Sequence, residues 1–191
     1  MTSTSFKLTF EEYLTYDDGT DKRYEYSDGG LLEMPPATGL HEAIITFLVI
    51  RFFLAIQELG LPLQVRPSGT EVQVPNQCRR PDVLVLTNEQ AAQIANTTAI
   101  LEAAPPLVVE VVSPESIDRD YNRKVSEYAA AGIPEYWIVD PLENKVSVLL
   151  LTNGRYEATV FTSSQQIASP TLSGLNLTAA QVLTAQLTIN Q

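Results

Sequence analysis

The 191-residue sequence predicts an α/β protein in which helices cover both faces of a mixed β-sheet. Two near-continuous apolar runs, at 82–87 ("DVLVLT") and 107–113 ("LVVEVVS"), have the pattern of strands that are covered on both faces. A helical segment at 116–132 and a further buried strand at 134–141 ("PEYWIVDP") follow the second run. This strand–helix–strand order is typical of α/β proteins and predicts the centre of the sheet.

The N-terminal residues predict a short helix and a β-hairpin. "LTFEEYLTYDD" (8–18) is expected to be helical, with Thr9 as its N-cap and acidic residues in its first turn. "RYEYSDGGLLEMPP" (23–36) alternates on either side of Asp28-Gly29, a pair that favours a tight turn between antiparallel strands.

Residues 41–59 predict a long apolar helix that ends at Gly60. Arg51 interrupts the apolar stretch, which is shorter than the ~20 residues that a membrane span requires. We therefore expect this helix to be buried within the protein, and we expect no membrane partner.

The remaining segments add shorter elements. Two strands are expected near 63–66 and 70–74, and the connecting segment 88–106 is expected to be partly helical. "KVSVLLLTNGRYEATVF" predicts a second hairpin that turns at Asn153-Gly154.

Length and composition predict a single domain, 1–191, with a core at about residues 22–160 and a polar C-terminal tail that holds a short final element. Hydrophobic residues make up 45% of the chain and charged residues 18%, which is typical of a folded protein. The single cysteine, Cys78, is expected to be buried or incidental. The absence of a disulfide pair and of a visible secretory signal predicts a cytoplasmic location.

The formal net charge of −11 constrains any nucleic-acid partner. Proteins that bind nucleic acids normally gain affinity by neutralising phosphates with Lys and Arg. We therefore expect weak nonspecific binding to DNA unless basic residues are concentrated locally.

Two carboxylates fall within the predicted buried strands. In "LVVEVVS", Val108, Glu110 and Val112 share one face because side chains alternate along a strand. An ionised carboxylate on a covered face is costly unless it is paired, hydrogen-bonded or bound to a metal. The alternative for Glu110 is a surface position on an edge strand. Asp82 begins the other strand, and its alternative is a turn cap.

Lys124 lies on the helix that follows Glu110. The predicted apolar stripe of this helix passes through Ile117, Tyr121, Val125 and Tyr128. Lys124 is on or beside this stripe, so its ammonium group could point toward the strand end that carries Glu110. The alternative is a boundary lysine whose stem covers tyrosine rings while its charge reaches water.

Together, Asp82, Glu110 and Lys124 predict a metal-dependent phosphodiester hydrolase. The acids would hold Mg²⁺, with Mn²⁺ as a second option, because such cations prefer oxygen ligands. The cation would lower the pKa of a bound water and neutralise charge on the phosphate oxygens. Lys124 would orient or activate that water, or stabilise the developing charge.

Four segments carry a family resemblance: "YEYSDGGLLEMPPATGLHEAI", "RRPDVLVLT", "PPLVVEVVSPES" and "DRDYNRKVSEYAAAGIPEYWIVDP". Their order resembles that of the PD-(D/E)xK nuclease superfamily and, more closely, of the Uma2-type (DUF820) restriction endonuclease family. The resemblance runs from about residue 10 to 160. It implies a restriction-endonuclease-like core, with a mixed β-sheet flanked by helices and an N-terminal helix and β-hairpin.

The resemblance also implies roles for individual residues. Asp82 and Glu110 would be metal ligands, with the Val111 carbonyl as a third. The superfamily pattern has a lysine two residues after the glutamate, where this chain has Val112. Lys124 would act instead from the following helix, and this departure leaves open a site that binds metal without cutting DNA.

The N-terminal segment supplies two secondary candidates, Glu25 and His41, at positions that match the family signature. Glu25 would complete a metal shell or, alternatively, pair with Lys22 or Arg23 on an exposed hairpin. His41 would contact phosphate or carry a proton, or would alternatively make a local hydrogen bond at the start of its helix.

Arginines near these motifs are candidates for phosphate contacts. Arg79 and Arg80 precede the "PD" motif, and Arg119 and Arg123 lie in the first turns of the lysine-bearing helix. If they converge, Arg80, Arg119 and Arg123 would position a strand by its phosphates, and the alternative is pairing with carboxylates. Asp120, between them, is expected to be a helix N-terminal acid.

The preferred hypothesis is a Mg²⁺-dependent endonuclease that hydrolyses DNA, with Asp82, Glu110 and Lys124 in an open cleft of positive potential. The alternative is a catalytically inactive nuclease-fold protein that acts as an interaction or regulatory module, with Lys124 turned away. A hydrolase of RNA or of another phosphate ester would use the same residues. Because two strands must be cut, we also expect a homodimer.

Overall fold

The computed structural model describes residues 7–20, 22, 24–27, 29–33, 36–75 and 77–186. Its elements are, in chain order, α1 (Phe10–Leu14), β1 (Tyr24–Ser27), β2 (Gly30–Glu33), α2 (Gly39–Glu58), β3 (Leu63–Pro67), β4 (Glu71–Val74), β5 (Gln77–Arg79), β6 (Val83–Thr87), α3 (Asn88–Gln93), β7 (Ile100–Leu101), β8 (Leu107–Val111), the π-helix η1 (Arg119–Arg123), α4 (Lys124–Ala130), β9 (Glu135–Asp140), β10 (Lys145–Thr152), β11 (Arg155–Thr162) and α5 (Ala179–Thr184).

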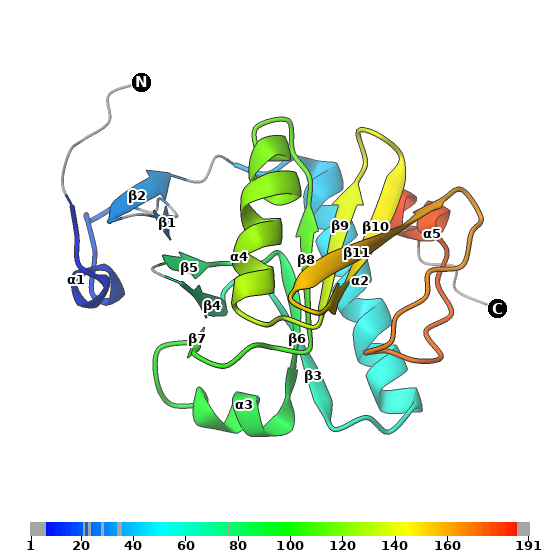
Figure 1. The fold of residues 1–191 in the computed structure, drawn as a ribbon, viewed down its shortest axis with the longest axis horizontal. Coiled ribbons are helices and arrows are strands. Elements are labelled where there is room, and N and C mark those ends of the chain that lie inside the picture. Colours follow the sequence, from blue (N-terminus) through cyan, green and yellow to red (C-terminus); the bar gives the residue numbers. More distant parts are fainter. Residues whose placement is uncertain are drawn as a thin grey trace.

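A six-stranded mixed sheet forms the centre of the molecule, with the strand order β11-β10-β9-β8-β6-β3. β8 and β9 are parallel and the other neighbours are antiparallel. η1 and α4 provide the crossover between the two parallel strands. Helices cover both faces, with α2 on one side of the sheet and α4 on the other (Figure 1). The predicted fold class is therefore confirmed.

Two smaller sheets lie beside the central one. β1 and β2 form the predicted N-terminal hairpin, and β4 joins β5 and β7 in a three-stranded sheet. The hairpin lies next to β5 (Figure 1). Ser27 pairs with Gly30 across its turn, and Asp28 lies outside the described residues. The strands expected on either side of "PSGT" both form, but β3 belongs to the central sheet and β4 to the smaller one.

The two faces of the central sheet pack against different helices. One cluster, which includes the buried side chains of α2, contains Val83, Val85, Val109 and Val111. The other cluster, which includes Tyr128 of α4, contains Leu84, Leu86, Val108 and Val112. Alternation along β8 therefore places Glu110 on the face that α4 covers, as the sequence predicts.

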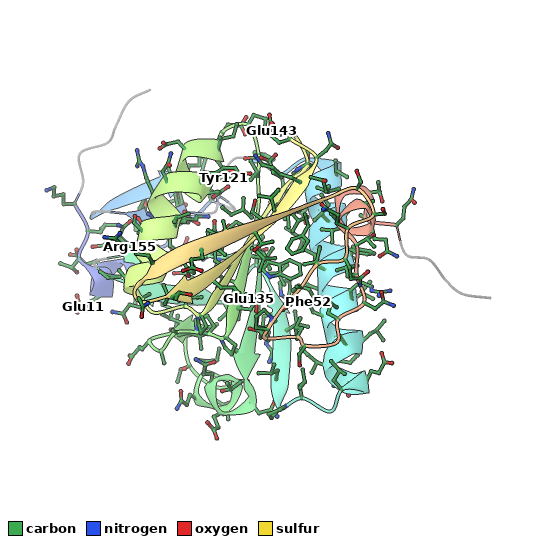
Figure 2. All side chains as sticks on the ribbon, turned by 45° about the vertical axis from the view of Figure 1, so that its right-hand side comes forward. Glu11, Phe52, Tyr121, Glu135, Glu143 and Arg155 are labelled. Atoms are coloured by element: carbon green, nitrogen blue, oxygen red, sulfur yellow. The ribbon has the colours of Figure 1, made fainter. Side chains whose placement is uncertain are left out.

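α2 is a core helix. The Thr38 hydroxyl caps it by accepting a hydrogen bond from the His41 amide at 3.2 Å, and Gly60, with a φ of +62°, follows its end. Seven of its side chains are buried, including Phe52, whose ring meets Trp137 edge-on at 5.4 Å. Figure 2 shows Phe52 between α2 and the sheet. By length and composition α2 could span a membrane, but core helices of soluble proteins pass the same test.

Local sequence signals explain the other boundaries. The predicted second hairpin joins β10 to β11 through Asn153 and Gly154, which both have a positive φ, as a tight hairpin turn requires. Thr9 caps α1 in a capping box, and α5 is the short element expected in the C-terminal tail. Cys78 is buried, as expected.

Candidate active site

Strand register brings the two predicted acids together. β6 and β8 are antiparallel, with Val83 opposite Val109, so continuing the register by one residue places Asp82 opposite Glu110. Residues opposite each other in antiparallel strands project from the same face of the sheet. Glu110 is only 3% exposed and lies on a central strand, so the alternative of an edge-strand surface position is wrong.

Asp82 is fixed by two neighbours. Its Oδ2 accepts a hydrogen bond from the Val111 amide at 2.7 Å, and the same oxygen lies 3.3 Å from His41 Nε2. The amide belongs to β8, so this bond joins two segments and is not the turn cap considered as the alternative. His41 comes from the first turn of α2, which the Thr38 cap positions at this end of the sheet.

Lys124 completes the predicted group. Its Nζ lies 2.8 Å from Glu110 Oε2 and 3.2 Å from Asp120 Oδ1. Tyr128, one turn later, donates a hydrogen bond to Glu110 Oε1 at 2.5 Å. Lys124 and Glu110 are both buried, so the alternative of a boundary lysine that reaches water is wrong.

The buried stripe of this helical segment differs from the predicted one. Ile117 is 46% exposed, whereas buried side chains recur every four residues, at Ser116, Asp120, Lys124 and Tyr128. The π-helical turn of η1 is wider than an α-helical turn, so side chains four residues apart stay close to one line along it. π-Helical turns are frequent at functional sites.

Asp120 lies in the first turn of η1, so it is a helix N-terminal acid as the sequence predicts. It is also 1% exposed, accepts a hydrogen bond from Ser116 Oγ and pairs with Lys124, and this place in the buried group was not predicted. The signal that could have identified it is the spacing of Ser116, Asp120 and Lys124, which places three polar side chains on one helix face.

Glu25 also faces inward. It is buried, with Oε2 at 3.4 Å from Nη1 of Arg79, and Arg79 Nε donates to Glu127 at 2.7 Å. Lys22 pairs with Glu33 instead, and Arg23 lies outside the described residues, so the exposed-hairpin alternative is wrong for Lys22. Arg79 is itself buried and therefore does not belong to a basic rim.

Of the three predicted phosphate-contact arginines, Arg80 and Arg119 converge on one pocket and Arg123 does not. Arg80 and Arg119 line the same pocket as Asp82 and Glu110, but Arg80 Nη2 is paired with Glu71 Oε1 at 2.5 Å. Arg123 is 68% exposed, is not among the pocket-lining residues and pairs with Asp118.

The pocket that contains these groups has a volume of about 720 Å³. Glu25, His41, Asp82, Glu110, Asp120 and Lys124 all line it. Seven of its lining residues are Asp or Glu and four are Lys or Arg, which leaves an excess of three negative charges when all are ionised. Acidic residues therefore outnumber the basic residues that were expected to give the cleft a positive potential.

Burial and the surrounding charges together shift the pKa values at the centre. Burial raises the pKa of Glu110 to about 8, an effect that Lys124 opposes and that Asp82 and Asp120 reinforce. Burial alone would lower the pKa of Lys124, but the surrounding carboxylates, Glu110 first, hold it above its ordinary value. Burial likewise opposes protonation of His41, but the hydrogen bond and charge of Asp82 outweigh it and raise the pKa of His41.

The residues present fit a hard divalent cation. Asp82 and Glu110 supply carboxylate oxygens on one face of the sheet, the Val111 backbone lies beside them, and the pocket has an excess of negative charge. Within the described part of the chain, no three Asp, Glu, His or Cys side chains are grouped to hold a metal. Such a cation would therefore depend on two carboxylates, a carbonyl and water, which is the kind of shell that Mg²⁺ accepts.

Comparisons with known proteins agree on the class. The fold matches a solved structure from Anabaena variabilis ATCC 29413, described as "a putative nuclease belonging to DUF820", with a TM-score of 0.77 and 20% sequence identity over 93% of this chain and 98% of that chain. The two therefore share a nuclease-like α/β fold.

The family model "Uma2: Putative restriction endonuclease" matches residues 10–180, and the chain belongs to this family. The resemblance found in the sequence is thus confirmed. A search of curated proteins gave no significant match. Family and fold together indicate a nuclease of the restriction-endonuclease-like class.

Proposed function

We propose that this protein is a metal-dependent endonuclease that hydrolyses the phosphodiester bonds of DNA. The observation that carries the proposal is the buried pair between Lys124 Nζ and Glu110 Oε2, 2.8 Å apart, with Asp82 opposite Glu110 on the neighbouring strand. Two carboxylates and a lysine on one face of a sheet, beside a pocket of about 720 Å³, suit attack on a phosphate ester.

Asp82 and Glu110, with the Val111 carbonyl, would hold Mg²⁺ or Mn²⁺. When bound, the metal supplies a water of lowered pKa and neutralises charge on the phosphate oxygens. The Val111 amide and His41 restrain the Asp82 carboxylate, and Tyr128 restrains that of Glu110. Because these partners fix both acids, little reorganisation would be needed to bind the cation.

Lys124 would act as a charged hydrogen-bond donor. Glu110 and Asp120 keep its ammonium protonated, so it would stabilise negative charge on the phosphate or orient the attacking water. Asp120, held by Ser116, would keep the ammonium group at this position.

The inactive-module hypothesis predicts a lysine that points away from the acids. Lys124 instead pairs with Glu110, and both residues line the same pocket as Asp82. This geometry supports the hydrolase in preference to the module.

The test is cleavage of supercoiled plasmid in the presence of Mg²⁺ or Mn²⁺. Wild type should nick or linearise the plasmid, whereas Asp82→Asn, Glu110→Gln and Lys124→Met should each reduce the rate by about 100-fold or more. Glu157→Gln, on exposed β11, is the matched control and should cleave like wild type. Failure of wild type to cleave either the plasmid or single-stranded DNA with either metal, or full activity in all three site variants, would refute the proposal.

A further inference from the structure

Arg119 has a different environment from the other cations of the pocket. Its side chain is 17% exposed, and its Nε, like that of Arg80, is buried without a hydrogen-bond partner. Among the described residues, no carboxylate oxygen lies closer to its guanidinium group than Asp120 Oδ1, at 4.0 Å. A guanidinium group carries five N–H donors in a planar fork that matches the oxygens of a phosphate. Arg119 can therefore offer unused donors to a ligand in the pocket.

Carboxylates already occupy the other pocket cations. Lys22 Nζ lies 2.9 Å from Glu33, and Arg80 Nη2 lies 2.5 Å from Glu71. Lys124 is shared between two acids and is buried. Among the residues that the structure describes, Arg119 is thus the one pocket cation without a carboxylate at hydrogen-bond distance, and acidic residues outnumber basic ones in the lining.

The rest of the chain offers no concentrated basic surface among its described residues. The sequence contains only twelve Lys and Arg residues. Those outside the pocket are spread over separate elements, and several are engaged: Arg51 with the Asn176 carbonyl, Arg66 with Gln64, Arg79 with Glu127, Arg123 with Asp118, and Lys145 over the Tyr121 ring. Duplex DNA carries about one negative charge per 1.7 Å of its axis, and proteins that grip it neutralise several phosphates at once.

We propose that the pocket binds a single phosphate group of an unpaired DNA strand through Arg119, and that single-stranded DNA is preferred over intact duplex. An unpaired strand can bend one phosphate into the pocket and direct its neighbours away from the acidic residues. A duplex is stiff and presents phosphates of both strands to the same surface, where the acids would repel them. The inference rests on the proposed function, in which this pocket receives a phosphate ester of DNA. Measurements of binding, without cleavage, are enough to test the inference.

The experiment measures fluorescence anisotropy of a labelled single-stranded oligonucleotide and of the duplex of the same sequence. Both titrations use full-length protein with Ca²⁺, and binding is the readout. Wild type should bind the single strand about tenfold or more tightly than the duplex. Arg119→Ala should weaken binding of the single strand about tenfold, and Arg119→Lys should recover part of the loss because it keeps the charge without the fork.

Arg123→Ala is the matched control, because Arg123 has the same side chain on the same helical segment but is exposed and paired with Asp118. It should bind like wild type. The salt dependence adds a second readout: the slope of log K against log salt should fall by about 0.7 in Arg119→Ala, the value expected for loss of one contact to a single strand.

Duplex binding as tight as single-strand binding, or equal effects of Arg119→Ala and Arg123→Ala, would overturn the inference. If Arg119→Ala does not fold, Arg119→Lys and the preference of wild type for the single strand still decide it. The proposed function fails separately: Arg119-dependent binding of single strands, without cleavage of either the plasmid or the single-stranded oligonucleotide in Mg²⁺ or Mn²⁺, supports the inference and refutes the nuclease. Cleavage of DNA together with binding that does not depend on Arg119 would support the nuclease and refute the inference.

Discussion

The two long helical segments of this protein cover opposite faces of one sheet with opposite chemistry. α2 buries apolar side chains such as Ile44, Leu48 and Phe52. The η1–α4 segment buries Asp120 and Lys124 against Glu110. Burial of apolar surface stabilises a fold by roughly 25 cal/mol per Å², whereas burial of charge costs free energy that pairing only partly returns. The α2 face therefore stabilises the fold through apolar burial, whereas the η1–α4 face combines its own apolar cluster with these buried charges.

Phe52→Ala should give the largest loss of stability, about 3–5 kcal/mol, because it empties a fully buried site beside Trp137. Urea unfolding followed by tryptophan fluorescence measures it. Phe53→Ala is the matched control: Phe53 is adjacent on α2 but 52% exposed, and its loss should cost under about 0.5 kcal/mol. Similar losses of stability for the two variants would show that the buried side of α2 does not stabilise the fold more than its exposed side.

Lys124→Ala should destabilise the fold by about 3 kcal/mol, because it leaves Glu110 and Asp120 as unpaired buried acids. A double-mutant cycle measures how much the interaction between Lys124 and Glu110 contributes to stability. Lys124→Met combined with Glu110→Gln should recover part of the stability lost in Lys124→Met alone, because Asp120 still lacks its partner, and should remain inactive. Additive losses in the double variant would show that Lys124 and Glu110 do not act as a pair.

The sequence predicts the α2 face better than the η1–α4 face. Apolar runs and turn residues predict the strand–helix–strand centre, the long helix and the turn at Asn153-Gly154, because these signals are local. Asp82 and Glu110 lie opposite each other because β6 and β8 are neighbouring antiparallel strands in which Val83 pairs with Val109.

The partners of buried charges could not be predicted in the same way. Glu25 and Arg79 are 54 residues apart and meet only through packing of the hairpin against β5. The burial of Asp120 was not predicted because the expected α-helical stripe does not account for the wider π-helical turn of η1. The ion pairs of Arg80 and Arg123, which reduce the predicted basic rim, likewise depend on the tertiary structure.

The pH dependence of stability should differ between wild type and Glu110→Gln. The pKa of Glu110 is raised from an ordinary value near 4.5 to about 8, mainly by burial. Between these values the folded chain keeps a proton that the unfolded chain releases, so wild type should lose stability as pH rises through this window. Glu110→Gln lacks this titration. If the unfolding free energies of wild type and Glu110→Gln change in parallel from about pH 4.5 to 8, Glu110 is not buried as described.

Thr38→Ala should have the smallest effect, a loss of about 1 kcal/mol, because it removes the N-cap of α2 without creating a cavity. Thr46→Ala, at an exposed position within the same helix, is the control and should leave stability unchanged or slightly higher. Thermal unfolding by circular dichroism distinguishes the two variants. Equal effects would indicate that capping does not position the start of α2, which carries His41.

The proposed binding of a divalent cation by Asp82 and Glu110 is tested most directly by calorimetric titration of Mn²⁺ into wild type and Glu110→Gln. Wild type should bind Mn²⁺ at a single site, with an affinity that rises toward about pH 8 as Glu110 releases its proton. Glu110→Gln should lose this binding, and Glu157→Gln should retain it. No saturable binding of Mn²⁺ by wild type, or unchanged binding by Glu110→Gln, would contradict the proposed metal site.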